Sequence, residues 1–148
     1  MTSAVIVDAV RTPAGKRGGK LKDWHPVDLV AETLASLQQR TGLDPGVVDD
    51  VIMGCVLTAG VGQAPARQAA IRGGIPDSVG AMTINKVCGS GLKAVMLASQ
   101  AIRAGDARCV VAGGMESMSN APHYVYGMRG GVKYGNQQLV DAVQYDGL

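Results

Sequence analysis

Aromatic side chains and long apolar runs are what this sequence lacks most. Phe is absent, and aromatic residues make up 3% of the 148 residues. No apolar stretch approaches the ~20 residues that a membrane-spanning helix needs, and no cationic segment precedes the first apolar run, so neither a membrane span nor a secretory leader is expected. The core must be aliphatic, and binding of single-stranded nucleic acid by stacking on aromatic platforms is disfavoured.

The sequence also lacks an excess of one charge and a set of paired cysteines. Lys and Arg total 14 against 12 for Asp and Glu. The basic residues are scattered except in one Gly-rich stretch with Lys16, Arg17, Lys20 and Lys22, so no nucleic-acid partner is expected. Three cysteines without a C-x-x-C pair argue against a disulfide framework and favour a reducing, cytoplasmic setting. These cysteines and two histidines give no metal-ligand spacing, so no metal is expected.

The residues that are present predict an α/β fold in which strands and helices alternate. Apolar, β-prone runs predict strands at 4–10, 50–56, 81–87 and 109–114, and the first of these is typical of a strand buried on both faces. Helical spacing predicts helices at 26–41, 65–72 and 92–102. This order predicts a mostly parallel central sheet with helices on both faces.

Two segments differ from the alternating strands and helices in their distribution of apolar residues. The helix predicted at 92–102 is apolar nearly all round, with Lys93 as its only charge, so we expect it to be central and buried. After Met118 the pattern dissolves into a long, glycine-punctuated stretch in which only 139–143 suggests a helical turn. Loops of this length in compact domains are usually functional or disordered.

The strongest chemical signal is Cys88, which lies between the strand predicted at 81–87 and the apolar helix. A helix N-terminus favours thiolate over thiol, so a cysteine placed there is a candidate nucleophile. Gly89, Ser90 and Gly91 leave room for a bulky substrate, and N–H groups at the helix start suit a developing oxyanion. Acyl transfer through a thioester is the reaction class that fits this arrangement.

Other interpretations of the same residues are weaker. Gly89 to Ala94 matches the dinucleotide-binding pattern G-x-G-x-x-A, with Glu116 as its acidic residue, but Glu116 is further along the chain than the usual spacing of ~20 residues. The glycines around Ser90 do not form the G-x-S-x-G of serine hydrolases. His25 and His123 are the only possible histidine bases. We expect His25 to be capping or solvated and His123 to lie at the surface.

At these residues the chain strongly resembles the thiolases, the acetyl-CoA C-acyltransferase family. The resemblance is carried, in order, by the motifs at Val5–Pro13, Gly62–Ala70, Asn85–Ala94 and Ala112–Pro122. It implies that Cys88 accepts the acyl group of acetyl-CoA or of a 3-ketoacyl-CoA as a thioester. It also implies that the coenzyme A thioester is a substrate and that no further cofactor is needed.

The resemblance also implies a domain organisation. Thiolases fold as two similar βαβαβαββ halves, with a loop domain inserted in the first half. Residues 1–118 are then an N-terminal α/β domain that is incomplete at its C-terminus, and residues 119–148 are the start of the loop domain that covers CoA. Thiolases are dimers or tetramers, so a homo-oligomer is expected.

One departure from the family pattern concerns the groups that activate the nucleophile. The later part of a thiolase supplies an Asn-Glu-Ala-Phe segment, a Gly-His-Pro histidine that activates the nucleophile, and a Cys-x-Gly cysteine that acts as acid and base. Here no histidine follows His123 and no cysteine follows Cys109. The isolated chain is therefore expected to be inactive and to need a complementary C-terminal thiolase polypeptide. The alternative is a non-catalytic assembly module with the same fold.

Overall fold

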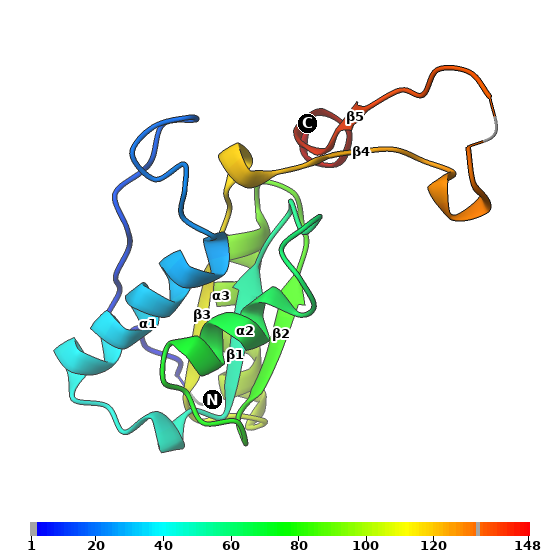
Figure 1. Ribbon diagram of the computed structural model, residues 1–148. Helices are drawn as coiled ribbons and strands as arrows, with labels where there is room; N and C mark the ends of the chain where they lie inside the picture. The colour runs from blue at the N-terminus through cyan, green and yellow to red at the C-terminus, as the bar shows by residue number, and fades with distance from the viewer. Residues whose placement is uncertain (1–2, 133) are drawn as a thin grey trace.

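A three-stranded parallel sheet with helices packed against it forms the centre of the structure, a computed structural model that describes residues 3–132 and 134–148 (Figure 1). The helices are α1 (Pro26–Thr41), α2 (Pro65–Arg72) and α3 (Ser90–Ala104), with short turns at Pro45–Val47, Met118–Asn120, Met128–Gly130 and Val143–Gly147. The strands are β1 (Asp50–Gly54), β2 (Gly80–Ile84), β3 (Val110–Gly114), β4 (His123–Tyr124) and β5 (Val140–Asp141). No helix in the described ranges is long and apolar enough to cross a membrane.

The sheet has the order β2-β1-β3, and β1 pairs in parallel with both neighbours. In this register Gly54 lies opposite Ile84 on one side and Gly114 on the other. The carboxyl ends of all three strands therefore meet at one edge of the sheet, which is where ligands bind in open α/β sheets. The prediction of an α/β fold with a parallel sheet is confirmed.

Helices α1 and α2 cover one face of the sheet and enclose the main core. Pro26 occupies the first turn of α1, where its missing N–H is harmless, and Gly42 ends the helix with a left-handed φ of 64°. The alanines of α2 allow it to pack closely against its neighbours. The core cluster includes Val27, Val30, Leu34, Val51, Met53, Ala66, Ala69 and Ala70.

Helix α3 packs against β1 and β3, but only one side of it is buried. The buried positions are Ser90, Ala94 and Ala98, which are four residues apart and form one narrow stripe. Leu92 is 69% exposed and Met96 is 47% exposed. The prediction of a helix buried on all sides is therefore wrong for this chain, because no described segment covers the second face.

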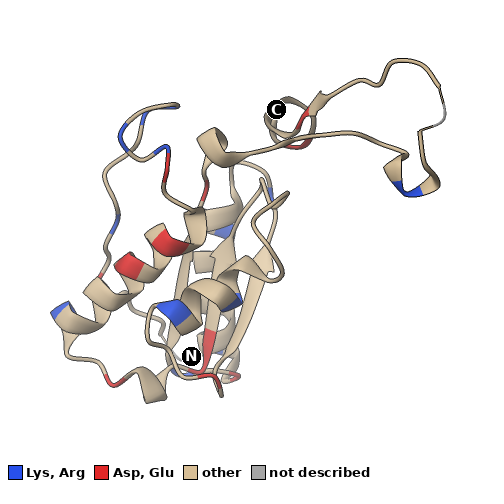
Figure 2. Cartoon of the chain, viewed as in Figure 1, with Lys and Arg blue, Asp and Glu red and all other residues tan. Residues whose placement is uncertain are grey.

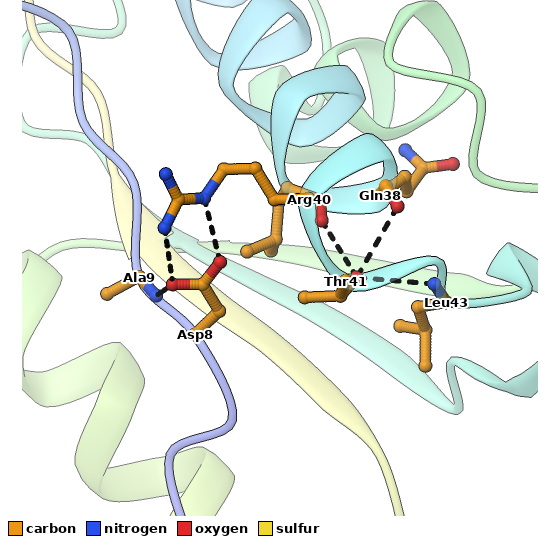
Figure 3. Close-up of polar contacts among 7 residues, drawn as sticks. Asp8, Ala9, Gln38, Arg40, Thr41 and Leu43 are labelled. Atoms are coloured by element: carbon orange, nitrogen blue, oxygen red, sulfur yellow. Dashed lines mark hydrogen bonds and ion pairs between the residues drawn. The ribbon is translucent and has the colours of Figure 1, made fainter.

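The N-terminal segment is not a strand, which corrects a second prediction. Val5, Ile6 and Val7 are 76–82% exposed, and residues 3–16 form no regular element. The sheet order β2-β1-β3 does not include this segment, so the apolar run has no strand partner among the described residues. Instead, Asp8 forms an ion pair with Arg40 of α1, with Nε 2.8 Å from Oδ2 (Figure 3).

The segment after β3 projects away from the sheet as a hairpin (Figure 1). Strands β4 and β5 pair antiparallel, with His123 opposite Asp141 and Tyr124 opposite Val140. The helical turn expected at 139–143 is shifted: β5 occupies 140–141, and a turn follows at Val143–Gly147. The cross-strand pairing explains the shift, because it holds these residues in extended conformation.

Candidate active site

The structure places Cys88 in the turn between the end of β2 and the start of α3. Its side chain is an exposed free thiol. Gly89 is the residue before the first turn of α3, and Lys93 donates its N–H to the Gly89 carbonyl at 2.8 Å. The strand-to-helix corner predicted from the sequence is therefore present, with β2 ending three residues earlier than expected.

Two side chains hold this turn in an unfavourable backbone conformation. Val87 has φ +47°, a left-handed value that a β-branched residue rarely adopts and that costs about 1–3 kcal/mol. Asn85 Oδ1 accepts the Val87 N–H at 2.9 Å. Ser90 Oγ accepts the Lys86 N–H at 2.8 Å and donates to the Val87 carbonyl at 2.7 Å. Ser90 is 4% exposed, so its buried hydroxyl joins the start of α3 to Lys86 and Val87, the residues just before Cys88.

Glycines let the start of α3 approach the strand ends with backbone against backbone. A Cβ added at Gly54 would lie 2.5 Å from the carbonyl carbon of Ser90 and 2.7 Å from the nitrogen of Gly91. A Cβ at Gly114 would lie 3.2 Å from the Cα of Gly91. The position of the Cys88 turn is thus set by contacts that leave no room for side chains.

Cys88 lines a pocket of about 400 Å³ at the carboxyl edge of the sheet. The pocket wall is mainly apolar, and the N–H groups of the first turn of α3, where Gly91 lies, have no acceptor within the helix. The lining residues come from four segments: Gly54, Val56 and Leu57; Val87, Cys88, Ser90 and Gly91; Gly114, Met115, Glu116 and Met118; and Val143, Gly147 and Leu148.

Glu116 is the acidic residue of the pocket, and its carboxylate binds the segment that follows β1. Its Oε2 accepts the N–H of Val56 at 3.0 Å, and its Oε1 accepts the N–H of Leu57 at 2.8 Å. The thiol of Cys55 also points at Oε1, with Sγ 3.8 Å away. The acidic residue that a dinucleotide site requires is therefore engaged within the chain.

The other two cysteines are more buried than Cys88, and each has a raised pKa. Cys55 is 1% exposed, and burial, followed by the nearby Glu116 carboxylate, raises its pKa to about 12. Cys109 precedes β3 at the opposite edge of the sheet, and burial, followed by the charge of Asp49, raises its pKa. Neither is suited to act as a nucleophile near neutral pH, since the thiolate is the reactive form.

Neither histidine lies in the pocket. His25 precedes α1 and makes no side-chain cap, and its Nδ1 is buried without a hydrogen-bond partner among the described residues. His123 is on β4, 54% exposed, with Nε2 3.9 Å from Oδ2 of Asp141 across the hairpin. The prediction of a surface position for His123 is confirmed. Of the two roles predicted for His25, capping is wrong because no side-chain bond reaches the α1 backbone, and full solvation is wrong because the ring is half-buried.

Comparison with known proteins places this arrangement in a family. The family model described as "Thiolase, N-terminal domain" matches residues 4–148. The chain belongs to the thiolase family. The resemblance carried by the motifs around Cys88 is thereby confirmed.

Curated relatives agree along the whole of this thiolase chain. The acetyl-CoA acetyltransferase of Cupriavidus necator is 57% identical over 148 residues, which are 100% of this chain and 38% of the relative. The probable acetyl-CoA acetyltransferase of Escherichia coli (strain K12) and the acetyl-CoA acetyltransferase of Pseudomonas aeruginosa are each 54% identical, with the same coverage. The thiolase chain thus spans 38% of the length of these relatives.

The sequence does not predict the structural roles of Ser90 and Glu116 in the candidate site. A serine one residue before a glycine at a helix start is a weak signal for a buried, hydrogen-bonded hydroxyl, because serine is common at exposed helix starts. Glu116 belongs to the motif at Ala112–Pro122 and matches the acidic residue of a dinucleotide-binding pattern, and neither pattern predicts its contacts. Its contacts with Val56 and Leu57 depend on which strands are neighbours, and no local pattern encodes that.

Proposed function

We propose that this chain is the N-terminal portion of a thiolase that transfers an acyl group through a thioester on Cys88. The observation that carries the proposal is the setting of the three thiols. Cys88 is exposed and lines the pocket, whereas Cys55 is buried and Cys109 lies at the far edge of the sheet. The names of the relatives support acetyl-CoA as the acyl donor.

In the proposed first step, the sulfur of Cys88 attacks the carbonyl carbon of an acyl-CoA thioester. The bond between that carbon and the CoA sulfur breaks, and CoA leaves after taking up the proton that the Cys88 thiol releases. The Gly91 N–H in the first turn of α3 supports this step, because it donates no hydrogen bond within the described chain and can donate to the oxyanion that forms on the carbonyl oxygen.

In the second step, the acyl group leaves Cys88. In the synthetic direction a second acetyl-CoA loses a methyl proton, and its carbanion attacks the thioester carbon to give acetoacetyl-CoA and free Cys88. In the degradative direction Cys88 first takes the acyl group from a 3-ketoacyl-CoA, with release of acetyl-CoA. The sulfur of a free CoA then attacks the acyl carbon, the bond to the Cys88 sulfur breaks, and acyl-CoA leaves.

Fast turnover needs a base, above all to remove the methyl proton of the second acetyl-CoA, and we propose that a complementary C-terminal thiolase polypeptide supplies it. A cysteine thiol is nucleophilic enough to take up an acyl group slowly without one. The pocket-lining residues include no histidine, whereas nucleophilic cysteine catalysis normally uses an adjacent base. The exposed face of α3, with Leu92 and Met96, supports such a complement because large apolar patches mark association surfaces. The isolated chain is accordingly proposed to be inactive in turnover.

We also propose that residues 119–148 begin the CoA-covering loop domain and that the thiolase forms a homo-oligomer. The hairpin exposes large apolar side chains, among them Tyr126, Met128 and Leu139. Figure 2 shows that charged residues are sparse along the projecting part of the hairpin. A cytoplasmic location is proposed on the strength of the three free thiols.

A non-catalytic assembly module is the second candidate. It is favoured by the same two observations that leave the site incomplete, the open face of α3 and the pocket without a histidine. Such a module would keep the fold and the association surfaces but would not acquire an acyl group.

Incubation with acetyl-CoA followed by peptide mass spectrometry separates these functions. Trypsin places the three thiols on separate peptides, 41–67 with Cys55, 87–93 with Cys88 and 109–129 with Cys109. We expect an acetyl adduct on peptide 87–93, none in the Cys88→Ser variant, and no cleavage of acetoacetyl-CoA by the chain alone. An unmodified Cys88 would refute the proposed function and leave the assembly module.

A further inference from the structure

A second thiol lies directly behind the wall of the Cys88 pocket. Cys55 follows β1, and its chain neighbours Gly54, Val56 and Leu57 all line the pocket, while Cys55 itself is 1% exposed. A thiol in this place is a potential competitor for acyl groups, because cysteine reactivity depends on access and on thiolate content. The structure must therefore keep acyl donors away from Cys55.

Glu116 holds the segment that follows the buried Cys55 and lines the pocket. Its two carboxylate oxygens accept the N–H groups of Val56 and Leu57, at 3.0 and 2.8 Å. Glu116 is itself fixed, because the preceding residue, Met115, donates its N–H to the Gly54 carbonyl at 2.9 Å. The Glu116 carboxylate thus links the segment after β3 to the segment after β1 by two hydrogen bonds.

The same carboxylate acts on the Cys55 sulfur. The distance between Sγ and Oε1 is 3.8 Å, so the thiol can donate to the carboxylate while a thiolate there would be repelled by it. The thiol is also 3.9 Å from the Leu57 carbonyl oxygen, a second acceptor that favours the protonated form. Contacts to one loop and one carboxylate therefore hold Cys55 as a neutral thiol.

We propose that Glu116 is a positioning residue that confines acyl transfer to Cys88, by holding Val56 and Leu57 over Cys55 and by keeping a negative charge beside that thiol. The proposal rests on the proposed function, in which Cys88 accepts the acyl group. It assigns Glu116 no contact with the substrate. Glu116 instead determines whether an electrophile in the pocket can reach the Cys55 thiol as well as the Cys88 thiol.

The test compares Glu116→Ala and Glu116→Gln with the wild-type chain and with Glu32→Gln, which makes the same charge change at an exposed position on α1. Each protein is alkylated with limiting iodoacetamide and digested with trypsin, which reports each thiol on its own peptide. A second arm replaces iodoacetamide with acetyl-CoA.

We expect Cys55 alkylation to rise about tenfold or more in Glu116→Ala, because hydrogen bonds to a charged group stabilise by at least that factor. The rise should be smaller in Glu116→Gln, whose carbonyl can still accept one N–H. Labelling of Cys88 and Cys109, and all labelling in Glu32→Gln, should stay within about twofold of wild type. With acetyl-CoA, an adduct on peptide 41–67 should appear in the Glu116 variants.

The proposal is overturned if Cys55 labelling in both Glu116 variants stays within about twofold of wild type. If all three thiols react together, the variants have unfolded. Hydrogen exchange in the wild-type chain then tests whether Glu116 holds Val56 and Leu57 in place. The amides of Val56 and Leu57 should then exchange at least about tenfold more slowly than those of Ala59 and Gly60, which donate no bond within the described chain. Equal rates would refute the role of Glu116.

Failure of this inference is distinguishable from failure of the proposed function. The function fails if acetyl-CoA leaves wild-type Cys88 unmodified, whatever the variants do. The inference fails if wild-type Cys88 is acetylated and Cys55 remains protected without the Glu116 carboxylate.

Discussion

The two faces of the central sheet are built in different ways. The α1/α2 face buries branched and sulfur-containing side chains such as Val51, Met53 and Leu34 in one continuous cluster. The α3 face buries only Ser90, Ala94 and Ala98 of its helix, and the helix start touches the strands through glycine backbones. The helices of the first face contribute large side chains to the core, whereas the helix of the second face contributes only small ones.

The difference shows how this thiolase chain separates stability from reactivity. Close approach of α3 to the strand ends fixes the Cys88 turn without large side chains that would fill the pocket. The same approach turns Leu92 and Met96 outward, where no described residue covers them. We infer that packing on the α1/α2 face supplies most of the stability of the fold and that packing on the α3 face positions Cys88. Each of the following predictions tests this division.

The largest effect is expected from truncation of a core side chain on the α1/α2 face. Leu34 is 3% exposed, so Leu34→Ala should lower the free energy of unfolding by about 2–5 kcal/mol. Leu92→Ala, on the open side of α3, should change it by less than about 0.5 kcal/mol. Urea denaturation of both variants provides the measurement. Similar losses in the two variants would contradict the comparison.

A smaller effect is expected where the α3 face has no room. The Cβ of Gly54→Ala would lie 2.5 Å from a backbone atom of Ser90, which no side-chain rotation can relieve. We expect a loss of about 1–3 kcal/mol, together with slower acetylation of Cys88, because the start of α3 must move. Gly130→Ala is the matched control, since its Cβ would meet nothing within 4 Å. Normal acetylation in Gly54→Ala would show that the close approach does not set the site.

The sequence predicts most of the sheet and helices because their patterns are local. Pro26, the helical spacing of apolar residues and Gly42 predict α1 within a residue, and the strand-turn-helix pattern predicts the setting of Cys88. The apolar run at 4–10 misleads because an apolar run signals burial, whereas in the structure no described strand pairs with this segment. An apolar run indicates that its side chains favour burial, but it does not indicate which residues would cover them.

Long-range polar contacts are beyond what the sequence predicts. It gives no preference between surface and anchoring roles for Arg67 and Gln68. In the structure Arg67 donates to the carbonyls of Asp77 and Val79, both at 2.6 Å, and Gln68 donates to that of Gln63 at 2.7 Å. Glu116 is the same kind of residue. The N–H and thiol groups that donate to its carboxylate become its neighbours only when β1 and β3 pair.

The smallest effect is expected at Cys55, which belongs to the core of the α1/α2 face and lies behind the pocket on the other. Its pKa is raised to about 12, mainly by burial, from an ordinary value of 9.0. Above pH 9 the unfolded chain loses this proton while the folded chain keeps it, so stability falls as pH rises, by about 1 kcal/mol at pH 10. Other groups also titrate there, so the measurement is the difference in pH dependence between wild type and Cys55→Ala. The variant should lose less stability between pH 8 and pH 10, whereas equal losses would mean that Cys55 is not held neutral where the two faces meet.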